Sequence, residues 1–280
     1  MPDSGAMKRS KQKPGRKPTC RPMGLNTLRM IRARLARQRL SLETAWSPRM
    51  SAFVLAALAT AFVAGLGDEW SIDLVNRSAS PVVDSLESIT DIALARWYFY
   101  PAALVALVLG LVDWSGRSRL TRLYLTFVFG QALFVAASVL LVRSITRTLK
   151  IAFGRQRPEL MHEDGAYEFE LFEFDNLYWS FPSGHAAIAG VATIVLILWF
   201  PRARLLLLPL GAILATSRVA AVEHYPSDVV AGFSIGALVT ILLARWLASR
   251  ALIFRHRPGK LIPGARWPRS GRQSPGTGDG

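Results

Sequence analysis

Three short polar segments, at residues 150–158, 182–185 and 217–228, each lie at the edge of a long apolar run. Polar side chains are costly beside apolar, membrane-like runs, so these segments are the first place to look for chemistry. Together they contain histidine, carboxylate, serine and several cations. These are the residue types that bind phosphate esters and cleave them.

The cations and the small residues of these segments could form an anion site. Lys150, Arg157 and Arg218 can surround an anion, and arginine can bind phosphate oxygens two at a time. Ser183 and Gly184 precede an apolar run that predicts a helix, where free backbone N–H groups and the helix dipole favour an anion. Glycine also lets a phosphate approach the backbone closely. We therefore predict that these five residues bind phosphate.

A histidine and a carboxylate four residues apart indicate a nucleophile. His224 precedes Pro226, which suits the first turn of a helix, and Asp228 lies within that turn. At this spacing the carboxylate can hold one ring nitrogen, which sets the tautomer and leaves the other nitrogen free to attack. His185 is then left as the proton donor for the leaving group. We predict that these three residues are catalytic.

The three segments together resemble the signature of the type 2 phosphatidic acid phosphatase family, which is Lys-x6-Arg-Pro, Pro-Ser-Gly-His and Ser-Arg-x5-His-x3-Asp. Any one segment alone would be an ordinary turn or helix end, but here every fixed position is filled. At about one chance in twenty per position, coincidence is rarer than roughly one in a million. The filled positions are Lys150, Arg157, Pro158, Pro182, Ser183, Gly184, His185, Ser217, Arg218, His224 and Asp228.

The resemblance implies a six-helix membrane core and hydrolysis of phosphate esters without a metal ion. It implies that His224 forms a phosphohistidine, that Asp228 orients it, and that His185 acts first as the acid and then as the base for water. Vanadium-dependent haloperoxidases have similar residues, but they are soluble, and the long apolar runs of this chain disfavour that class. The residues that the resemblance assigns to phosphate binding are Lys150, Arg157, Ser183, Gly184 and Arg218.

Nothing in the sequence indicates a metal or cofactor site. The one cysteine, Cys20, lies in a stretch rich in Lys, Arg and Pro, without Cys or His partners at metal-ligand spacing. The four histidines do not form a metal-ligand cluster along the chain either. We expect no metal ion and no cofactor, and no nucleic acid partner because no nucleic-acid motif is visible.

The composition indicates that these motifs belong to a membrane protein. Of the 280 residues 51% are hydrophobic, yet the formal net charge is +15, so apolar and basic residues must be segregated along the chain. We predict an all-α polytopic integral membrane protein with six transmembrane helices. The six apolar runs lie at about residues 50–67, 97–114, 123–142, 186–200, 203–221 and 229–248.

The distribution of charge predicts the orientation of these helices. With a cytoplasmic N-terminus, the inside segments hold 25 of the 34 Lys and Arg residues, as the positive-inside rule requires. The same orientation places all three motifs outside. We therefore expect both termini in the cytoplasm and the active site on the outer face, facing the periplasm if the membrane is a cell inner membrane. The inside segments are 1–49, 115–122, 201–204 and 249–280.

The chain divides into three parts. Residues 1–49 are expected to form a basic, largely disordered cytoplasmic arm. Within it, residues 28–37 fit either a basic amphipathic helix on anionic lipid or a solvated positive segment. Residues 50–250 form the predicted membrane phosphatase domain, and residues 251–280 a basic disordered cytoplasmic tail.

The sequence therefore predicts a lipid phosphatase that hydrolyses a phosphate monoester or pyrophosphate at the outer leaflet. The motifs bind the phosphate and not the lipid, so phosphatidic acid, phosphatidylglycerol phosphate, isoprenoid pyrophosphate and lipid A all remain candidate substrates. A phosphotransferase that passes the phosphate to an acceptor lipid is the first alternative. A non-enzymatic lipid-binding or transport protein is the second, and the sequence does not indicate an oligomeric state.

Overall fold

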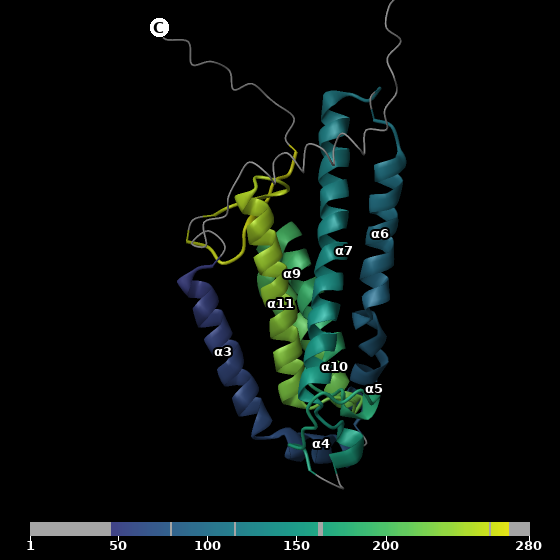
Figure 1. The fold of residues 1–280 in the computed structure, drawn as a ribbon, viewed down its shortest axis with the longest axis vertical. Helices are drawn as coiled ribbons and strands as arrows, with labels where there is room; N and C mark the ends of the chain where they lie inside the picture. Colours follow the sequence, from purple (N-terminus) through teal and green to yellow (C-terminus); the bar gives the residue numbers. More distant parts are fainter. Residues whose placement is uncertain (1–45, 79, 115, 162–164, 258, 269–280) are drawn as a thin grey trace, which may run out of the picture.

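The structure is a computed structural model that describes residues 46–78, 80–114, 116–161, 165–257 and 259–268. The predictions of a disordered arm and of an amphipathic helix at 28–37 lie outside the described residues, apart from residues 46–49. The described part of the chain is mainly helical (Figure 1). Its α-helices are α3 (Pro48–Gly65), α4 (Asp68–Asn76), α5 (Pro81–Ser88), α6 (Ala95–Leu111), α7 (Arg119–Phe153), α9 (Gly184–Trp199), α10 (Arg204–Ala220) and α11 (Pro226–Ser249).

Each of the six apolar runs falls on one of the helices. Within the described residues, five segments are long and apolar enough to cross a membrane. They contain α3, α6, α7, α10 and α11, with α5 and α6 counted as one segment. The sixth apolar helix, α9, has 16 residues, which is short for a span that needs roughly 17–25. The long apolar helices indicate an integral membrane protein. The number of six transmembrane helices remains a prediction.

Helices α9 and α11 form the centre of the bundle, and glycines let them approach closely. A Cβ atom on Gly232 would lie 2.2 Å from the backbone oxygen of Ser183, and one on Gly236 would lie 1.9 Å from that of Ala187. Gly190 of α9 is equally close to the backbone of α11, at Phe233. Small residues at helix contacts are typical of membrane bundles. The close approach brings the start of α9, with the Pro-Ser-Gly-His motif, to the start of α11.

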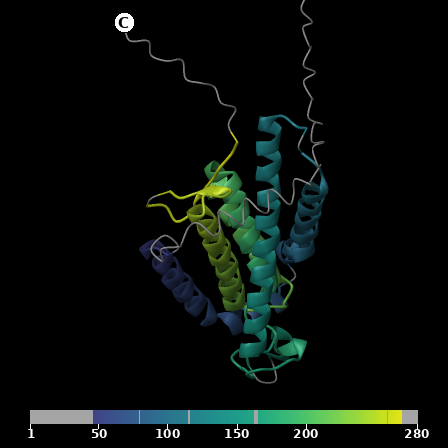
Figure 2. The same ribbon diagram turned by 45° about the horizontal axis from the view of Figure 1, so that its top comes forward.

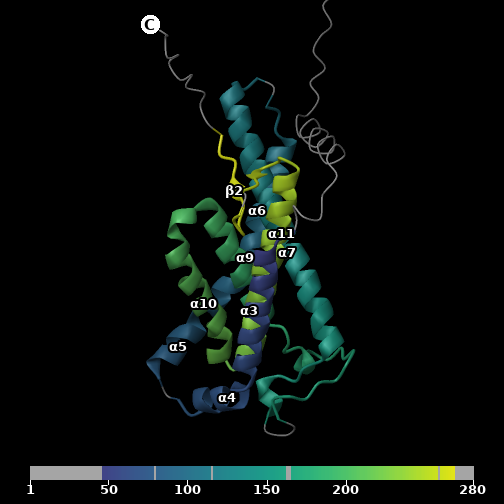
Figure 3. The same cartoon turned by 90° about the vertical axis from the view of Figure 1, so that its left-hand side faces the viewer.

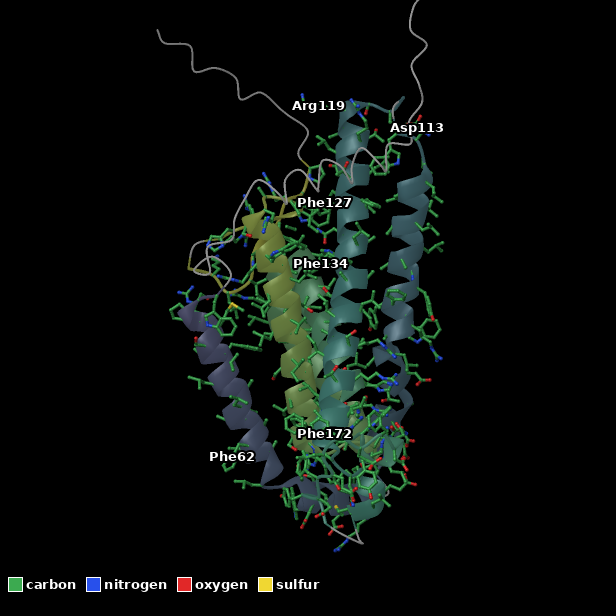
Figure 4. All side chains as sticks on the ribbon, in the orientation of Figure 1. Phe62, Asp113, Arg119, Phe127, Phe134 and Phe172 are labelled. Atoms are coloured by element: carbon green, nitrogen blue, oxygen red, sulfur yellow. The ribbon has the colours of Figure 1, made fainter. Side chains whose placement is uncertain are left out.

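Helix α7 is longer than the apolar run on which it was predicted, and it carries the first motif beyond the bundle. It begins after Ser118, whose hydroxyl accepts a hydrogen bond from the backbone of Thr121, and it ends at Gly154. Gly154 has φ of +52°, and a Cβ atom there would lie 1.5 Å from the backbone oxygen of Glu170, so only glycine fits. Figure 4 shows α7 running from Arg119 at one end toward the loop of Phe172 at the other.

The described part of the C-terminal segment is folded, which differs from the disordered tail predicted for residues 251–280. Two short antiparallel strands, β1 (Phe254–Arg255) and β2 (Gly264–Ala265), pair with each other. Phe254 is completely buried, and its ring lies edge-on against Phe134 of α7, with 4.8 Å between centroids. Burial of this aromatic ring anchors the segment, although its basic residues had predicted that it is exposed to solvent.

The two ends of the bundle differ in what they carry. The loop between α7 and α9 lies at one end with α4, while the hairpin of β1 and β2 lies at the other (Figure 2). The described chain also begins near the hairpin, at the start of α3 (Figure 1). All three motifs lie at the end that carries the α7–α9 loop.

Candidate active site

Four helix ends bring the three motifs together. Lys150 lies in the last turn of α7, and its side chain is close to Gly184, where an added Cβ would lie 3.9 Å from Cε of Lys150. The backbone N–H of Ser183, just before α9, donates to the backbone oxygen of Asp228 in α11 at 3.0 Å. Arg218 lies in the last turn of α10, and His224 follows in the connection to α11. Segments 150–158, 182–185 and 217–228 therefore form one site.

His224 and Asp228 are both buried, and a serine lies with them. The Nδ1 atom of His224 is 3.9 Å from Oδ2 of Asp228, which is longer than a hydrogen bond. Ser180 donates its hydroxyl to Oδ2 of Asp228 at 2.5 Å, and its Oγ is 3.5 Å from Nδ1 of His224. Asp228 also accepts a hydrogen bond from the backbone N–H of Tyr225 at 3.1 Å. The carboxylate is thus fixed on the Nδ1 side of the ring.

Burial keeps His224 neutral. The side chain is 2% exposed, and loss of solvation lowers its pKa to about 3, a shift that neighbouring cations such as Lys150 reinforce and Asp228 opposes. An imidazole with so low a pKa is unprotonated at neutral pH, so it has a lone pair to use as a nucleophile.

A buried ion network holds Asp228 from its other side. Arg155 is 3% exposed, and its guanidinium donates to Oδ1 of Asp228 at 2.6 Å and to Oδ2 of Asp68 at 2.8 Å. Asp68, the first residue of α4, also accepts from the backbone N–H of Ser227 at 3.0 Å and from its hydroxyl at 2.5 Å. This network fixes both the first turn of α11 and the carboxylate that faces His224.

The remaining contacts of Arg155 complete its coordination. It donates to the backbone oxygen of Ala166 from Nε at 3.0 Å and from Nη2 at 2.7 Å, and its guanidinium lies 4.2 Å from the ring centroid of Tyr225. Burial disfavours the charge of Arg155, but Asp228 and Asp68 outweigh that effect and raise its pKa. Arg155 is therefore a permanent buried cation whose donors serve the protein and not a ligand.

Two of the predicted phosphate-binding arginines share one carboxylate. Oε2 of Glu223 lies 2.9 Å from Arg157 and also accepts a hydrogen bond from Arg218. Burial opposes ionisation of Glu223, but Arg218 and Arg157 outweigh it and hold the pKa of this carboxyl below its usual value. Arg218 also donates to the hydroxyl of Thr90 at 3.1 Å, while its buried Nε has no hydrogen-bond partner among the described residues.

The start of α9 has two backbone donors to offer. The hydroxyl of Ser183 caps the helix by accepting from the backbone N–H of Ala186, although at 3.4 Å this bond is long. The N–H groups of Gly184 and His185 have no hydrogen-bond partner in the described part of the chain. The backbone N–H of Ser183 is different, because Asp228 takes it. At the start of α9, the backbone N–H groups left for an anion are therefore those of Gly184 and His185. Ser183, which the sequence also predicted, has only its hydroxyl to contribute.

The ammonium of Lys150 donates to the backbone oxygen of Trp179, just before the second motif. This bond ties the end of α7 to the entrance of α9. The described residues contain no group of three or more His, Cys, Asp or Glu side chains that could hold a metal ion. The positive charges of this site are the side chains of Lys150 and the arginines.

Sequence reasoning did not assign roles to Ser180, Arg155 or Asp68. Arg155 lies inside the first polar segment but at no position of the family signature, and Ser180 lies just before the second motif. Asp68 is 87 positions from Arg155 and begins a short helix, where an acidic residue is ordinary. The one available signal was a polar residue next to a motif, and it applies to Arg155 and Ser180 but not to Asp68.

The bundle and the site define a membrane enzyme of phosphate chemistry. The profile of the PAP2 superfamily matches residues 131–251, which include all three motifs. The chain is 31% identical over 187 residues to a lipid A 1-phosphatase of Rhizobium johnstonii, a match that covers 65% of this chain and 75% of the relative. It is 34% identical over 144 residues to a lipid A 1-phosphatase of Rhizobium etli, covering 51% and 61%. No solved structure matches.

The chain belongs to the PAP2 superfamily, as the motifs indicated. It is a membrane lipid phosphatase and therefore a phosphoric ester hydrolase. The prediction of a phosphatase is confirmed, and the non-enzymatic alternative is set aside.

Proposed function

We propose that this protein removes the 1-phosphate of lipid A through a phosphohistidine on His224. The choice of lipid A over phosphatidic acid, phosphatidylglycerol phosphate and isoprenoid pyrophosphate rests on the two Rhizobium relatives, both lipid A 1-phosphatases. The observation that carries the mechanism is the buried, neutral His224, whose Nδ1 side faces Asp228 and Ser180. Its Nε2 is then the nitrogen available to phosphorus.

In the first step Nε2 of His224 attacks phosphorus and the bond from phosphorus to the lipid oxygen breaks. His185, protonated because the bound phosphate anion lies beside it, donates a proton to that departing oxygen. Lys150, Arg157 and Arg218 stabilise the negative charge of the transferring phosphoryl group, with the backbone N–H groups of Gly184 and His185 as further donors. For Arg157 and Arg218 to do this, the phosphate must share or replace the carboxylate of Glu223.

In the second step water attacks the phosphohistidine and the bond from nitrogen to phosphorus breaks. His185, now deprotonated, takes a proton from the water, and inorganic phosphate leaves with His224 returned to its neutral form. Asp228 stabilises the charge on the His224 ring during both steps. Ser180 and Arg155 are positioning residues because they contact Asp228, and Asp68 acts on the same carboxylate through Arg155.

We further propose that the three motifs face the outer side of the membrane, with six spans and both termini in the cytoplasm. The inside segments of this orientation carry most of the Lys and Arg residues, which supports it. Reporter fusions at residue 118 and at the C-terminus should then report cytoplasm, and a fusion near residue 165 should report the outside. A cytoplasmic signal at residue 165 would place the chemistry at the inner leaflet.

The activity is tested with purified full-length protein in detergent and a panel of lipid phosphates, including lipid A, in excess chelator. Release of inorganic phosphate fastest from lipid A, unaffected by chelator, is the expected result. A preference for another lipid would overturn the substrate, and activity that requires added magnesium would overturn the metal-free mechanism. Label that appears on an acceptor lipid instead of in free phosphate would favour the phosphotransferase.

The two histidines are separated by single-turnover experiments with labelled substrate. His224→Ala should abolish the phosphoenzyme on every substrate. His185→Ala should slow phosphoenzyme formation from a lipid monoester, whose leaving oxygen is basic, much more than from an activated aryl phosphate. Its phosphoenzyme should also persist, because water is no longer activated. Equal slowing on both substrates without accumulation would reject the acid and base roles of His185.

A further inference from the structure

A second charged hollow lies against the hairpin of β1 and β2. This hairpin lies at the end of the bundle opposite α4 (Figure 3). The hollow is bounded by the hairpin together with the end of α9 and the start of α10. Its volume is about 880 Å³, within the range of sites that hold small ligands. We name it the basic pocket, and its cationic residues are Arg49, Arg204, Arg255, Arg257, Lys260 and Arg266.

The charge of the basic pocket is one-sided. None of the described residues that line it is acidic, and none of its six cations forms an ion pair with another described residue. Cations gathered around a hollow repel one another and focus a positive potential into it. The arrangement is therefore unfavourable by itself and favourable once an anion binds.

These cations come from distant parts of the chain, and the hairpin brings them together. Arg49 lies at the start of α3, Arg204 at the start of α10, and the other four beyond α11. The guanidinium of Arg257 lies directly on β2, because a Cβ atom on Gly264 would be 2.6 Å from its Nε. Tertiary folding, and not a run of basic residues, thus makes the pocket.

The lining of the pocket fits a lipid better than a soluble anion. Ile197 and Leu198 of α9 and Leu261 and Ile262 of the hairpin line it together with the cations. It also lies at the ends of helices that are apolar enough to cross a membrane. Basic pockets of this kind between membrane helices bind phosphate-bearing headgroups, with apolar residues next to the acyl chains.

We propose that the basic pocket binds the phosphate-bearing headgroup of an anionic membrane lipid, at a site separate from the one where the substrate is cleaved. In the orientation proposed above, this lipid belongs to the inner leaflet. Its binding would fasten the hairpin to the ends of α3 and α10. The proposal does not depend on which lipid the active site cleaves.

The test uses the full-length protein in detergent, with lipid binding followed by native mass spectrometry. Phosphatidylglycerol is the probe, phosphatidylcholine the uncharged control, and inorganic phosphate the soluble competitor. The variant Arg255→Gln/Arg257→Gln removes two charges of the pocket. The variant Arg117→Gln/Arg119→Gln removes two exposed charges outside the pocket. Arg119 lies at the start of α7, near the same end of the molecule (Figure 4).

Phosphatidylglycerol should bind more tightly than phosphatidylcholine and resist millimolar phosphate. The pocket variant should lose about 30-fold in affinity, since each basic residue near an anionic surface contributes roughly fivefold. The control variant should bind as the wild type does. Equal losses in both variants, or equal binding of the two lipids, would overturn the proposal, and so would displacement by phosphate. Hydrolysis of a short-chain soluble phosphate should continue in both variants, which separates this result from any failure of the proposed catalysis.

Discussion

The Nδ1 atom of His224 lies 3.9 Å from Oδ2 of Asp228, so the two residues face each other without a direct hydrogen bond. The hydroxyl of Ser180 occupies the position beside them, 2.5 Å from Oδ2 of Asp228 and 3.5 Å from Nδ1 of His224. The orientation of His224, the proposed nucleophile, therefore depends on Ser180 as well as on Asp228, the partner that the family signature contains.

Ser180→Ala should lower kcat by about tenfold, because loss of one hydrogen bond to a charged group costs about 1.4 kcal/mol or more. KM should stay nearly constant, since Ser180 contacts the carboxylate and not the predicted phosphate ligands. Steady-state kinetics on one lipid phosphate measures both values. Ser138→Ala, at a buried serine in the middle of α7, is the matched control and should leave kcat unchanged. A rise in KM with kcat unchanged would place Ser180 at the substrate instead.

The buried ion network should contribute strongly to stability. Asp68→Asn leaves the Arg155 guanidinium without one of its two carboxylates in a site that water does not reach. Breaking a buried pair by removing one partner costs about 3–5 kcal/mol. The loss should appear as a lower denaturation midpoint in detergent, together with a lower kcat.

The exposed pair of Asp73 and Arg77, 3.6 Å apart, is the control for this network. Asp73→Asn should change the denaturation midpoint little, because exposed pairs contribute about 0–1 kcal/mol. Arg155→Gln combined with Asp68→Asn should cost less than the sum of the two single changes, because the partners share one interaction. Additive losses would show that Asp68 and Arg155 act independently.

Glu223 should compete with phosphate for two arginines. Because its carboxylate bonds both Arg157 and Arg218, Glu223→Gln should release their donors and tighten the binding of inorganic phosphate or vanadate by severalfold. The inhibition constant of vanadate measures the effect. Glu159→Gln, at an exposed residue of the α7–α9 loop two positions after Arg157, is the control. Weaker vanadate inhibition in Glu223→Gln would show instead that Glu223 holds the arginines in place for the ligand.

The low pKa of His224 predicts acid sensitivity. The unfolded chain protonates this imidazole near its ordinary pKa of 6.5, whereas the folded protein does so only at about 3. Between these values the unfolded state binds more protons, so stability should fall as pH drops from 6.5 toward 3, by up to ~1.4 kcal/mol per pH unit.

Thermal unfolding in detergent at several pH values checks this slope. His224→Asn should flatten it, whereas His256→Asn, at an exposed histidine beyond β1, should not. An unchanged slope in His224→Asn would assign the acid sensitivity to other groups.

The sequence by itself determined the family, the reaction class and the helical membrane architecture. Eleven motif residues at fixed spacing are a local pattern, and apolar runs of helical length are another. Both can be recognised without knowing any contact in the folded protein. Groups on neighbouring helical turns recur at a fixed spacing, and a helix that spans a bilayer needs a fixed length of apolar residues. The gathering of 150–158, 182–185 and 217–228 at one end of the bundle could also be expected, since all three segments lie at helix ends of the same side.

The tertiary structure alone decided which groups surround those residues. Asp68 reaches Arg155 across 87 positions and Ser180 reaches Asp228 across 48, and no periodicity links positions so far apart. The close contact of α9 with α11 and the burial of Phe254 depend in the same way on packing between distant helices. The basic residues of the C-terminal segment predicted that it is exposed to solvent. Instead, Phe254 is buried against the bundle, and the segment that it anchors supplies most of the cations of the basic pocket. Local patterns determine which residues can react, while long-range packing decides which partners orient them.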